Sequence, residues 1–339
     1  MKILFVSTRQ AKPSFRFRVE QVLPFYQQRG HECEVAFLPK SLWARMSLYR
    51  SLKRFDVVVI QKRLLSRVEL GIVRRNSKRL VYDLDDAIMF NGQGVAQGKR
   101  RARFRAMVRA ADLTICGNDY LAEQTRPFTS RWTIIPTPID GTRFHPKLRG
   151  TVSNRGYQRE VVIGWTGSRS TNRYLNALFP VLAKLSGTVR CKVLSDVTDD
   201  LDFQQLGRIP ARFEPWSPER ELQETATFDI GVMPLPDDPW TRGKCGFKAL
   251  QYMALGIPAV CSPVGVNRTI ITHGKNGFLA ENPDDWFQSL STLVENVELR
   301  NRLGEAARQR IEADYALHVI GPRFVAAVEG NAVTQMRVA

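Results

Sequence analysis

The sequence has no long apolar run and no excess of acidic residues. A helix that spans a bilayer needs about 20 consecutive apolar residues, and no stretch reaches that length. The opening residues, MKILFVST, are too short for a signal peptide and precede no small-residue cleavage site, so they predict a buried strand. These absences favour a cytoplasmic protein without a transmembrane segment.

Cysteine is scarce and unpatterned. The chain has five cysteines among 339 residues, with no CxxC pair and no Cys/His cluster that would indicate zinc. An odd number of scattered cysteines is typical of reduced thiols in a cytoplasm. We therefore expect neither a disulfide framework nor a metal centre.

Charge is unevenly distributed. The net charge is +17, and residues 1–150 hold 29 Lys and Arg against 12 Asp and Glu, while residues 151–339 hold 21 of each. Such asymmetry indicates a surface for an anionic partner, either nucleic acid or an acidic membrane, or a merely soluble basic surface. No recognition-helix pattern, zinc spacing or RNA-binding aromatic pair supports nucleic acid, so we expect no nucleic-acid partner.

Buried strands alternate with helical patterns along the whole chain, which predicts parallel sheets with right-handed crossovers. The expected strands of the first half are 2–7, 32–38, 55–61, 79–84, 113–118 and 133–140, and those of the second half are 161–167, 190–196, 228–235 and 258–262. A polar stretch between the two series lacks apolar periodicity and reads as a linker. The predicted organisation is an α/β fold with two doubly wound, Rossmann-like domains: 1–148, a linker over 149–160, 161–316, and a C-terminal helix and tail over 317–339 that crosses back to the first domain.

Three segments carry a family resemblance. ADLTICGNDYLAEQTRPF with WTIIPTPIDGTRFHP, GKCGFKALQYMALGIPAVCSPVGVNRTIITHGKNGFLAENPDDW, and VELRNRLGEAARQRIEADYAL resemble the corresponding parts of family 4 (group 1) glycosyltransferases of the GT-B fold. Residues 243–280 are the specific part of this resemblance. It implies an acceptor on the first domain and a nucleotide-sugar on the second, with no cofactor and no metal.

The resemblance also implies a donor site. The family carries two glutamates eight positions apart, which face the donor sugar and the ribose, and here Gly243 and Gln251 occupy those positions. Gln251 can still hydrogen-bond a ribose diol. A glycine turn opening a helix suits phosphate binding, and the family has a basic pair near such a turn. The donor-binding candidates are Thr166, Gly167, Ser168, Arg169, Arg173, Trp216, Lys244, Cys245, Gly246, Phe247, Lys248 and Gln251.

Three aspartates follow the expected strand 79–84. Asp83 and Asp85 form a DxD pattern that in other glycosyltransferases holds a metal, an interpretation that the GT-B resemblance disfavours. Asp85 or Asp86 can instead accept the acceptor's proton or stabilise positive charge on the donor sugar. Helix capping with local ion pairs is the structural alternative. We predict Asp85, Asp86, Lys244 and Arg169 as catalytic residues.

Basic segments of the first half suggest acceptor and membrane contacts. Arg16 and Arg18 lie in a loop or helix after the first strand and are candidates for an anionic acceptor, or are solvated. Residues 41–55 place Leu42, Met46 and Tyr49 on one helical face beside arginines, which suits a membrane interface or ordinary packing. Residues 99–109 carry six basic side chains.

The predicted function is a metal-independent, retaining glycosyltransferase. It would transfer a sugar from a nucleoside diphosphate to a polysaccharide, glycolipid or lipid-linked acceptor, as a peripheral protein at the inner face of the plasma membrane. Two alternatives remain: a non-catalytic nucleotide-sugar-binding protein, and a GT-B sugar-nucleotide epimerase or hydrolase.

Overall fold

The computed structural model describes residues 1–7, 12–152 and 160–331. The chain forms two compact units. Unit 1 comprises 1–138, 238–245 and 317–339, and unit 2 comprises 139–237 and 246–316. The first unit therefore ends ten residues before the expected boundary at 148, and it includes a short segment from the second half of the chain. Residues 153–159 of the expected linker lie outside the described residues.

The first sheet has six parallel strands in the order β2-β1-β3-β4-β5-β6. Its strands are β1 (Lys2–Ser7), β2 (Glu32–Phe37), β3 (Val57–Gln61), β4 (Arg79–Leu84), β5 (Leu113–Cys116) and β6 (Trp132–Ile134). The central strands are buried on both faces, which explains their continuous apolar runs. All six ends point the same way, so the residues after each strand gather at one edge of the sheet.

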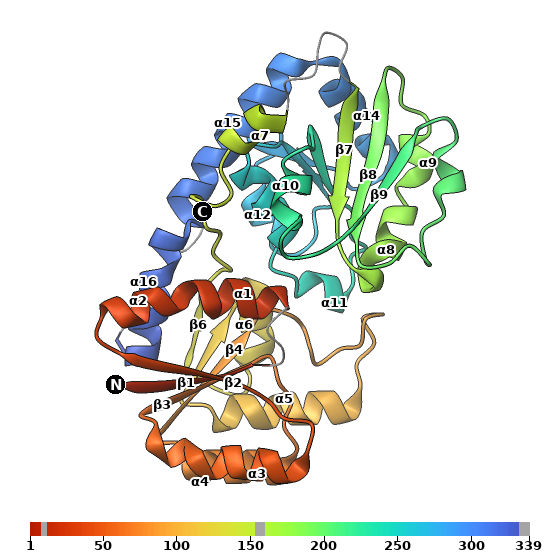
Figure 1. The fold of residues 1–339 in the computed structure, drawn as a ribbon. Helices are drawn as coiled ribbons and strands as arrows, with labels where there is room; N and C mark the ends of the chain where they lie inside the picture. The colour runs from red at the N-terminus through yellow and green to blue at the C-terminus, as the bar shows by residue number, and fades with distance from the viewer. Residues whose placement is uncertain (8–11, 153–159, 332–339) are drawn as a thin grey trace. The chain divides into compact units, whose positions relative to one another are not determined.

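Helices cover both faces of this sheet (Figure 1). One face packs against α1 (Pro13–Arg18), the 3-10 helix η1 (Glu20–Val22), α2 (Leu23–Gln28) and α16 (Leu317–Glu329). The other face packs against α3 (Leu42–Ser51), η2 (Leu52–Arg54), α4 (Arg67–Asn76), α5 (Gly98–Ala110) and α6 (Asp119–Thr125). Because α16 comes from the end of the chain, the core of unit 1 closes only when the C-terminal helix docks.

The second sheet also has six parallel strands, in the order β12-β11-β10-β7-β8-β9. They are β7 (Val161–Thr166), β8 (Val189–Ser195), β9 (Ala211–Pro215), β10 (Ile230–Met233), β11 (Ala259–Cys261) and β12 (Gly277–Leu279). The two edge strands, β9 and β12, were not expected, because each is short and lacks a long apolar run. The prediction of two parallel α/β sheets is confirmed.

Unit 2 contains both short and long helices. They are α8 (Arg169–Asn176), α9 (Phe179–Leu182), η3 (Phe203–Leu206), α10 (Glu221–Thr225), α12 (Phe247–Ala254), α13 (Asn267–Ile270), α14 (Pro283–Glu295) and α15 (Val297–Asp314), with α7 (Lys147–Val152) ahead of them. The short helix α11 (Pro239–Arg242) belongs to unit 1. Within the described residues, no helix is long and apolar enough to cross a membrane.

Candidate active site

An ion pair lies in the core of unit 1, at the end of β4. The Arg18 guanidinium donates to both Asp83 oxygens, with Nη2 2.6 Å from Oδ1, and its Nη1 donates to the Ile135 carbonyl at 3.0 Å. The two side chains are 0% and 4% exposed. Burial lowers the pKa of Arg18, but Asp83 outweighs burial and holds it above the ordinary value.

The predicted acceptor arginines are therefore core residues. Arg18 directs its donors to Asp83 and to backbone and hydroxyl oxygens, and its guanidinium lies 4.9 Å from the centre of the Phe324 ring. Arg16 is 8% exposed, with its guanidinium 5.1 Å from the Phe17 ring. Neither residue has the exposure that contact with a large acceptor requires. The pairing also occupies Asp83, which disfavours the DxD metal interpretation.

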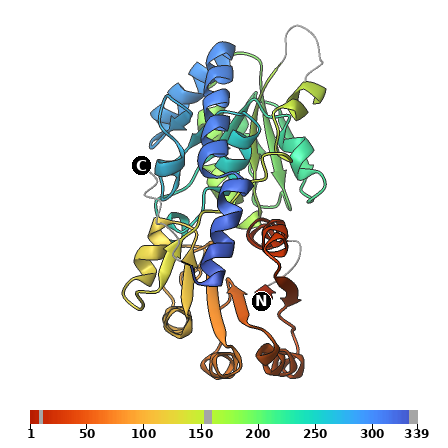
Figure 2. The same cartoon turned by 90° about the vertical axis from the view of Figure 1, so that its left-hand side faces the viewer.

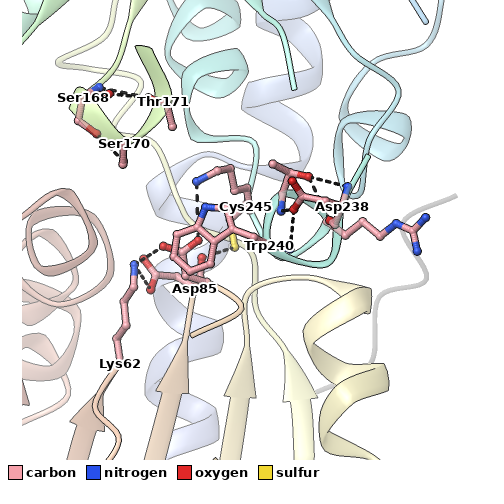
Figure 3. A network of polar contacts seen from close by, with 12 residues as sticks. Lys62, Asp85, Ser168, Ser170, Thr171, Asp238, Trp240 and Cys245 are labelled. Carbon is pink, nitrogen blue, oxygen red and sulfur yellow. Dashed lines mark hydrogen bonds and ion pairs between the residues drawn. The ribbon is translucent and has the colours of Figure 1, made fainter. Parts of the chain in front are cut away.

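Asp85 and Asp86 share one lysine that sequence analysis did not select. Lys62, one residue after β3, places its Nζ 2.5 Å from Asp86 Oδ2 and 3.3 Å from Asp85 Oδ1 (Figure 3). Its backbone has φ of 50°, in the left-handed region where residues other than glycine are uncommon. The fold thus holds this lysine in an unfavourable conformation where it meets both carboxylates.

Burial and ion pairing have opposite effects on the pKa values of Asp85 and Lys62. Burial raises the pKa of the Asp85 carboxyl, while the Lys62 ammonium acts in the opposite direction. Burial lowers the pKa of Lys62, but the two carboxylates outweigh it and raise that pKa above its ordinary value. A raised carboxyl pKa is what a group that accepts or donates a proton near neutral pH requires.

Residues 238–245 close over this strand edge within unit 1. Asn118 Nδ2 donates to the Lys244 carbonyl at 2.9 Å, and Cys245 Sγ lies 3.3 Å from the Asp85 carbonyl oxygen. Gly243 lies so close to Ala87 that an added Cβ would be 2.3 Å from the Ala87 Cβ. A glutamate at position 243 therefore conflicts with the packing of this chain.

Lys244 joins the same cluster. Its Nζ lies 4.0 Å from Asp86 Oδ1 and 5.0 Å from the centre of the Trp240 ring, and its side chain is 17% exposed. Trp240 is positioned by α11, whose first turn is capped by the Asp238 carboxylate (Figure 3). Lys244 and Cys245 thus meet Asp85 and Asp86 at one strand edge, although 160 residues of sequence separate Asp85 from Cys245.

In the predicted phosphate-binding turn of unit 2, residues 166–168, the backbone N–H groups donate to partners within the chain. The Thr166 N–H donates to the Tyr252 hydroxyl at 3.0 Å, and the Gly167 N–H donates to the Leu194 carbonyl at 2.9 Å. The Ser168 N–H donates to Thr171 Oγ1 in the cap of α8. The prediction that Thr166, Gly167 and Ser168 supply N–H and hydroxyl donors to the donor phosphate stays a prediction, although their N–H groups already have partners within the chain. The Ser168 hydroxyl lies 3.1 Å from the Ser170 hydroxyl (Figure 3) and also takes part in the capping box of α8.

The two predicted arginines of α8 have local partners. The Arg169 guanidinium is exposed and lies 3.3 Å from Asp200, and the backbone N–H of Arg169 donates to the Asp196 carboxylate at 2.7 Å. Arg173 donates to the Tyr174 hydroxyl at 3.0 Å and lies over the same ring. Arg169 can reach a diphosphate only by exchanging Asp200 for it.

Helix α12 begins with a glycine that no other residue can replace easily. Gly246 has φ of 66°, and an added Cβ would lie 2.2 Å from Ile270 Cδ1. No side chain caps this end. The first N–H groups of a helix point along its axis, out of the N-terminal end, where an anion can accept from them. Lys248 lies in this first turn with its Nζ 5.5 Å from the Trp165 ring. Phe247, between them, is partly buried.

Gln251 is buried and meets a carboxylate. It is 1% exposed, and its Nε2 donates to Glu221 Oε1 at 3.0 Å. A glutamate from α10 therefore lies beside the position where the family resemblance expects one on α12. Trp216, after β9, is partly buried, and its N–H donates to the Ser195 carbonyl at 2.8 Å. Base stacking by Trp216 stays a prediction.

Among the described residues, no group of three or more His, Cys, Asp or Glu side chains is arranged to hold a metal ion. The residues that sequence analysis missed are Lys62, Asn118, Trp240 and Glu221. A lysine directly after a buried strand was the one available signal for Lys62, and nothing local distinguished the other three.

Known proteins resemble both the sequence and the fold. Residues 233–310 match the family described as "Glycosyl transferases group 1". The spore coat protein SA of Bacillus subtilis is 30% identical over 84 residues, which cover 24% of this chain and 22% of that protein. A D-inositol 3-phosphate glycosyltransferase of Nocardioides sp. is 22% identical over 278 residues, which cover 73% of this chain and 60% of that protein. The chain thus spans less than two thirds of the length of these curated relatives.

The fold has solved counterparts. The Anabaena protein Alr3699/HepE, in complex with UDP and glucose, is 16% identical with a TM-score of 0.77, and the match covers 97% of this chain and all of that one. At this identity the likeness concerns the fold. Residues 233–310 thus match the group 1 glycosyltransferase family, and the two sheets of the chain have the fold of solved GT-B glycosyltransferases.

Proposed function

We propose that the protein is a retaining glycosyltransferase that transfers a sugar from a nucleoside diphosphate sugar to a polysaccharide, glycolipid or lipid-linked acceptor. The observation that carries the proposal is that the group 1 match falls on α12 and the strands around it, where the helix begins at an uncapped glycine beside a lysine. The family 4 subdivision remains part of the proposal.

The donor diphosphate would bind at the start of α12. The helix-end field contributes about 0.3–1 kcal/mol to anion binding, and hydrogen bonds to charged groups about 1.5–3 kcal/mol each. Lys248 supplies positive charge at this point. The catalytic role of Lys244, a residue of unit 1, stays part of the proposal. UDP and glucose, bound in the Anabaena protein, make UDP-sugars the first donors to test.

Asp85 and Asp86 are the proposed acid–base and charge-stabilising groups. Lys62 balances their charge, and burial keeps the pKa of Asp85 above its ordinary value. Departure of the diphosphate would be stabilised by Lys248 and the helix amides of α12, without a metal or cofactor. Attack on the same face of the sugar then preserves the anomeric configuration.

Binding of the donor can be tested directly. Thermal melting of the purified protein with UDP-, GDP- and ADP-sugars should show a raised melting temperature with one of them, because a ligand that binds the folded state stabilises it. Lys248→Ala should abolish most of this shift. Lys184→Ala, an exposed lysine elsewhere in unit 2, is the control. If no member of the panel shifts the melting temperature, the proposed donor site is wrong.

A second candidate is a protein that binds nucleotide-sugar without transferring it, or an epimerase or hydrolase. It is favoured by the packing of Gly243 against Ala87 and by the burial of Gln251, since neither position offers the family's carboxylate to a donor. Mass spectrometry of the donor, with and without membrane extract, separates the three functions. Transfer consumes the donor only with extract, hydrolysis or epimerisation needs no extract, and a binding protein consumes none.

A further inference from the structure

Three helices lie side by side on one face of the first sheet. Figure 2 shows α3, α4 and α5 end-on as a layer beneath the strands. Their inner sides, which include Tyr49, Val73 and Phe104, are buried in the core of unit 1. We call the outer surface of α3, η2, α4 and α5 the basic face. It is the side of these helices that faces away from the buried core of unit 1.

The basic face is almost free of negative charge. These four described elements contain thirteen lysine and arginine residues, six of them in α5, and Glu69 is their one acidic residue. Glu69 is engaged locally, because it accepts from Arg45 at 3.1 Å, from Tyr49 at 3.2 Å and from the Ser66 N–H at 2.9 Å. No exposed carboxylate within these elements offsets the positive field.

Apolar side chains project from the same face. Trp43 is 84% exposed, Leu42 is 64% exposed and Val68 is 73% exposed. They occupy the first turns of α3 and α4. For Met46 and Tyr49 the structure agrees with the second of the two alternatives left open above, ordinary packing, since both pack against the core.

These first turns lie near the strand edge that carries Asp85 and Asp86. Helix α3 begins five residues after β2 ends, and α4 begins six residues after β3 ends, so both start beside the carboxyl ends of the sheet. Arg100 of α5 donates to the Ile88 carbonyl at 2.8 Å, which ties α5 to the loop that follows Asp86.

We propose that the basic face docks on the surface of an anionic lipid bilayer, with Leu42, Trp43 and Val68 entering the interface and the arginines binding acidic headgroups. Each Lys or Arg near such a surface strengthens binding about fivefold, and tryptophan favours the interface because its ring is amphipathic. Nucleic acid would be attracted by the charge, but it gains little from exposed leucine and valine.

This inference deepens the proposed function, because it places a lipid-linked acceptor beside Asp85 and Asp86. It needs neither donor nor turnover, so its test is independent of glycosyl transfer. The experiment is flotation of the full chain with phosphatidylcholine vesicles, with and without about one third phosphatidylglycerol. We expect flotation with the acidic vesicles only, and loss of flotation at high salt.

Variants distinguish the basic face from diffuse charge. The double variant Leu42→Ser and Trp43→Ser should reduce the vesicle partition coefficient about tenfold or more, because both side chains lose their burial in the interface. Arg101→Gln with Arg105→Gln should reduce it by about fivefold per residue. The matched controls in unit 2, Val297→Ser and Lys184→Gln with Arg302→Gln, should leave it unchanged.

Three results would overturn the proposal. The first is no flotation with acidic vesicles at low salt. The second is an equal loss in the unit 2 controls, which would indicate non-specific charge. The third is a combined result: duplex DNA or RNA binds the wild type and abolishes its flotation, and the variant Leu42→Ser with Trp43→Ser still binds vesicles. That result would assign the face to nucleic acid.

Discussion

The two units differ in how buried the ion pairs are at the carboxyl ends of their strands. Unit 1 encloses its charges: Arg18 and Asp83 are almost fully buried, and Lys62 pairs with Asp85 and Asp86. In unit 2 the ion pair at the start of α8 is open to solvent, with the Arg169 and Asp200 side chains 61% and 46% exposed. Buried ion pairs are costly to break, whereas exposed ones contribute little.

This comparison shows that two similar sheets can differ in role through the partners of their charged side chains. In unit 1 the charges are fixed in place before any substrate binds, which suits residues that must hold a reacting group. In unit 2 the Thr166 N–H in the turn before α8 is already used by the fold, and the start of α12 is the proposed anion-binding element. The predictions below test this contrast.

The largest effect should come from Arg18→Met. Removing the arginine leaves Asp83 buried without its partner, so the free energy of unfolding should fall by about 3–5 kcal/mol in urea denaturation. Arg29→Met, which removes an arginine from an exposed pair with Glu329, should change it only slightly. Wild-type stability combined with a loss of acceptor binding would instead restore Arg18 to the acceptor site.

Lys62→Met should destabilise unit 1 by about 3 kcal/mol at neutral pH, because two carboxylates lose their cation. Lys62 opposes the effect of burial on Asp85, so its removal moves the pKa of Asp85 further upward. A carboxyl whose pKa is raised by folding costs stability as pH rises past its ordinary value and costs none below it. The loss should therefore be smaller at acidic pH. An equal loss at pH 4 and pH 7.5 would show that packing, and not charge, is responsible.

Gly243→Ala tests whether the family's carboxylate position has been closed. The new Cβ would lie 2.3 Å from the Ala87 Cβ, and such overpacking costs about 1–3 kcal/mol. Ala87→Gly should recover part of the loss when combined with it. Stability can be followed by thermal melting, and an unchanged melting temperature for Gly243→Ala alone would mean that the segment yields freely.

Gln251→Glu should have the smallest effect, about 1–2 kcal/mol at neutral pH, because it places a second carboxylate against Glu221. Two such groups raise one carboxyl pKa, so the variant should regain stability as pH falls. Gln204→Glu, which adds the same charge at an exposed position in unit 2, is the control. Tighter donor binding by Gln251→Glu would indicate that position 251 faces the nucleotide after all.

Much of the fold follows from local patterns. Apolar runs alternating with helical periodicity predicted the central strands of both sheets, because buried parallel strands are apolar on both faces. The edge strands β9 and β12 were not predicted, since β9 is largely exposed and β12 has three residues. The glycine that begins α12 was predicted as a phosphate-binding element, and its left-handed backbone and tight contact with Ile270 give the physical reason for glycine there.

Site residues were predictable only in part. Asp85 and Asp86 were selected because three aspartates follow one buried strand, at the edge of a parallel sheet where ligands bind in such folds. Their partner Lys62 and the closing segment 238–245 were not, and the arginines at 16 and 18 were assigned to an acceptor although they are buried. Periodicity shows which residues are apolar, but it does not show which cation meets which anion.

The sequence alone therefore determined the alternation of strands and helices, the concentration of positive charge in the first half and the glycine that opens α12. Only the tertiary structure decided that Arg18 neutralises Asp83, 65 residues away, that Lys62 serves two aspartates, and that residues 238–245 join unit 1. The physical reason is the distance along the chain over which each feature is determined. Strand and helix patterns arise from neighbours along the chain, whereas ion pairs and burial depend on which strands the sheet order places side by side.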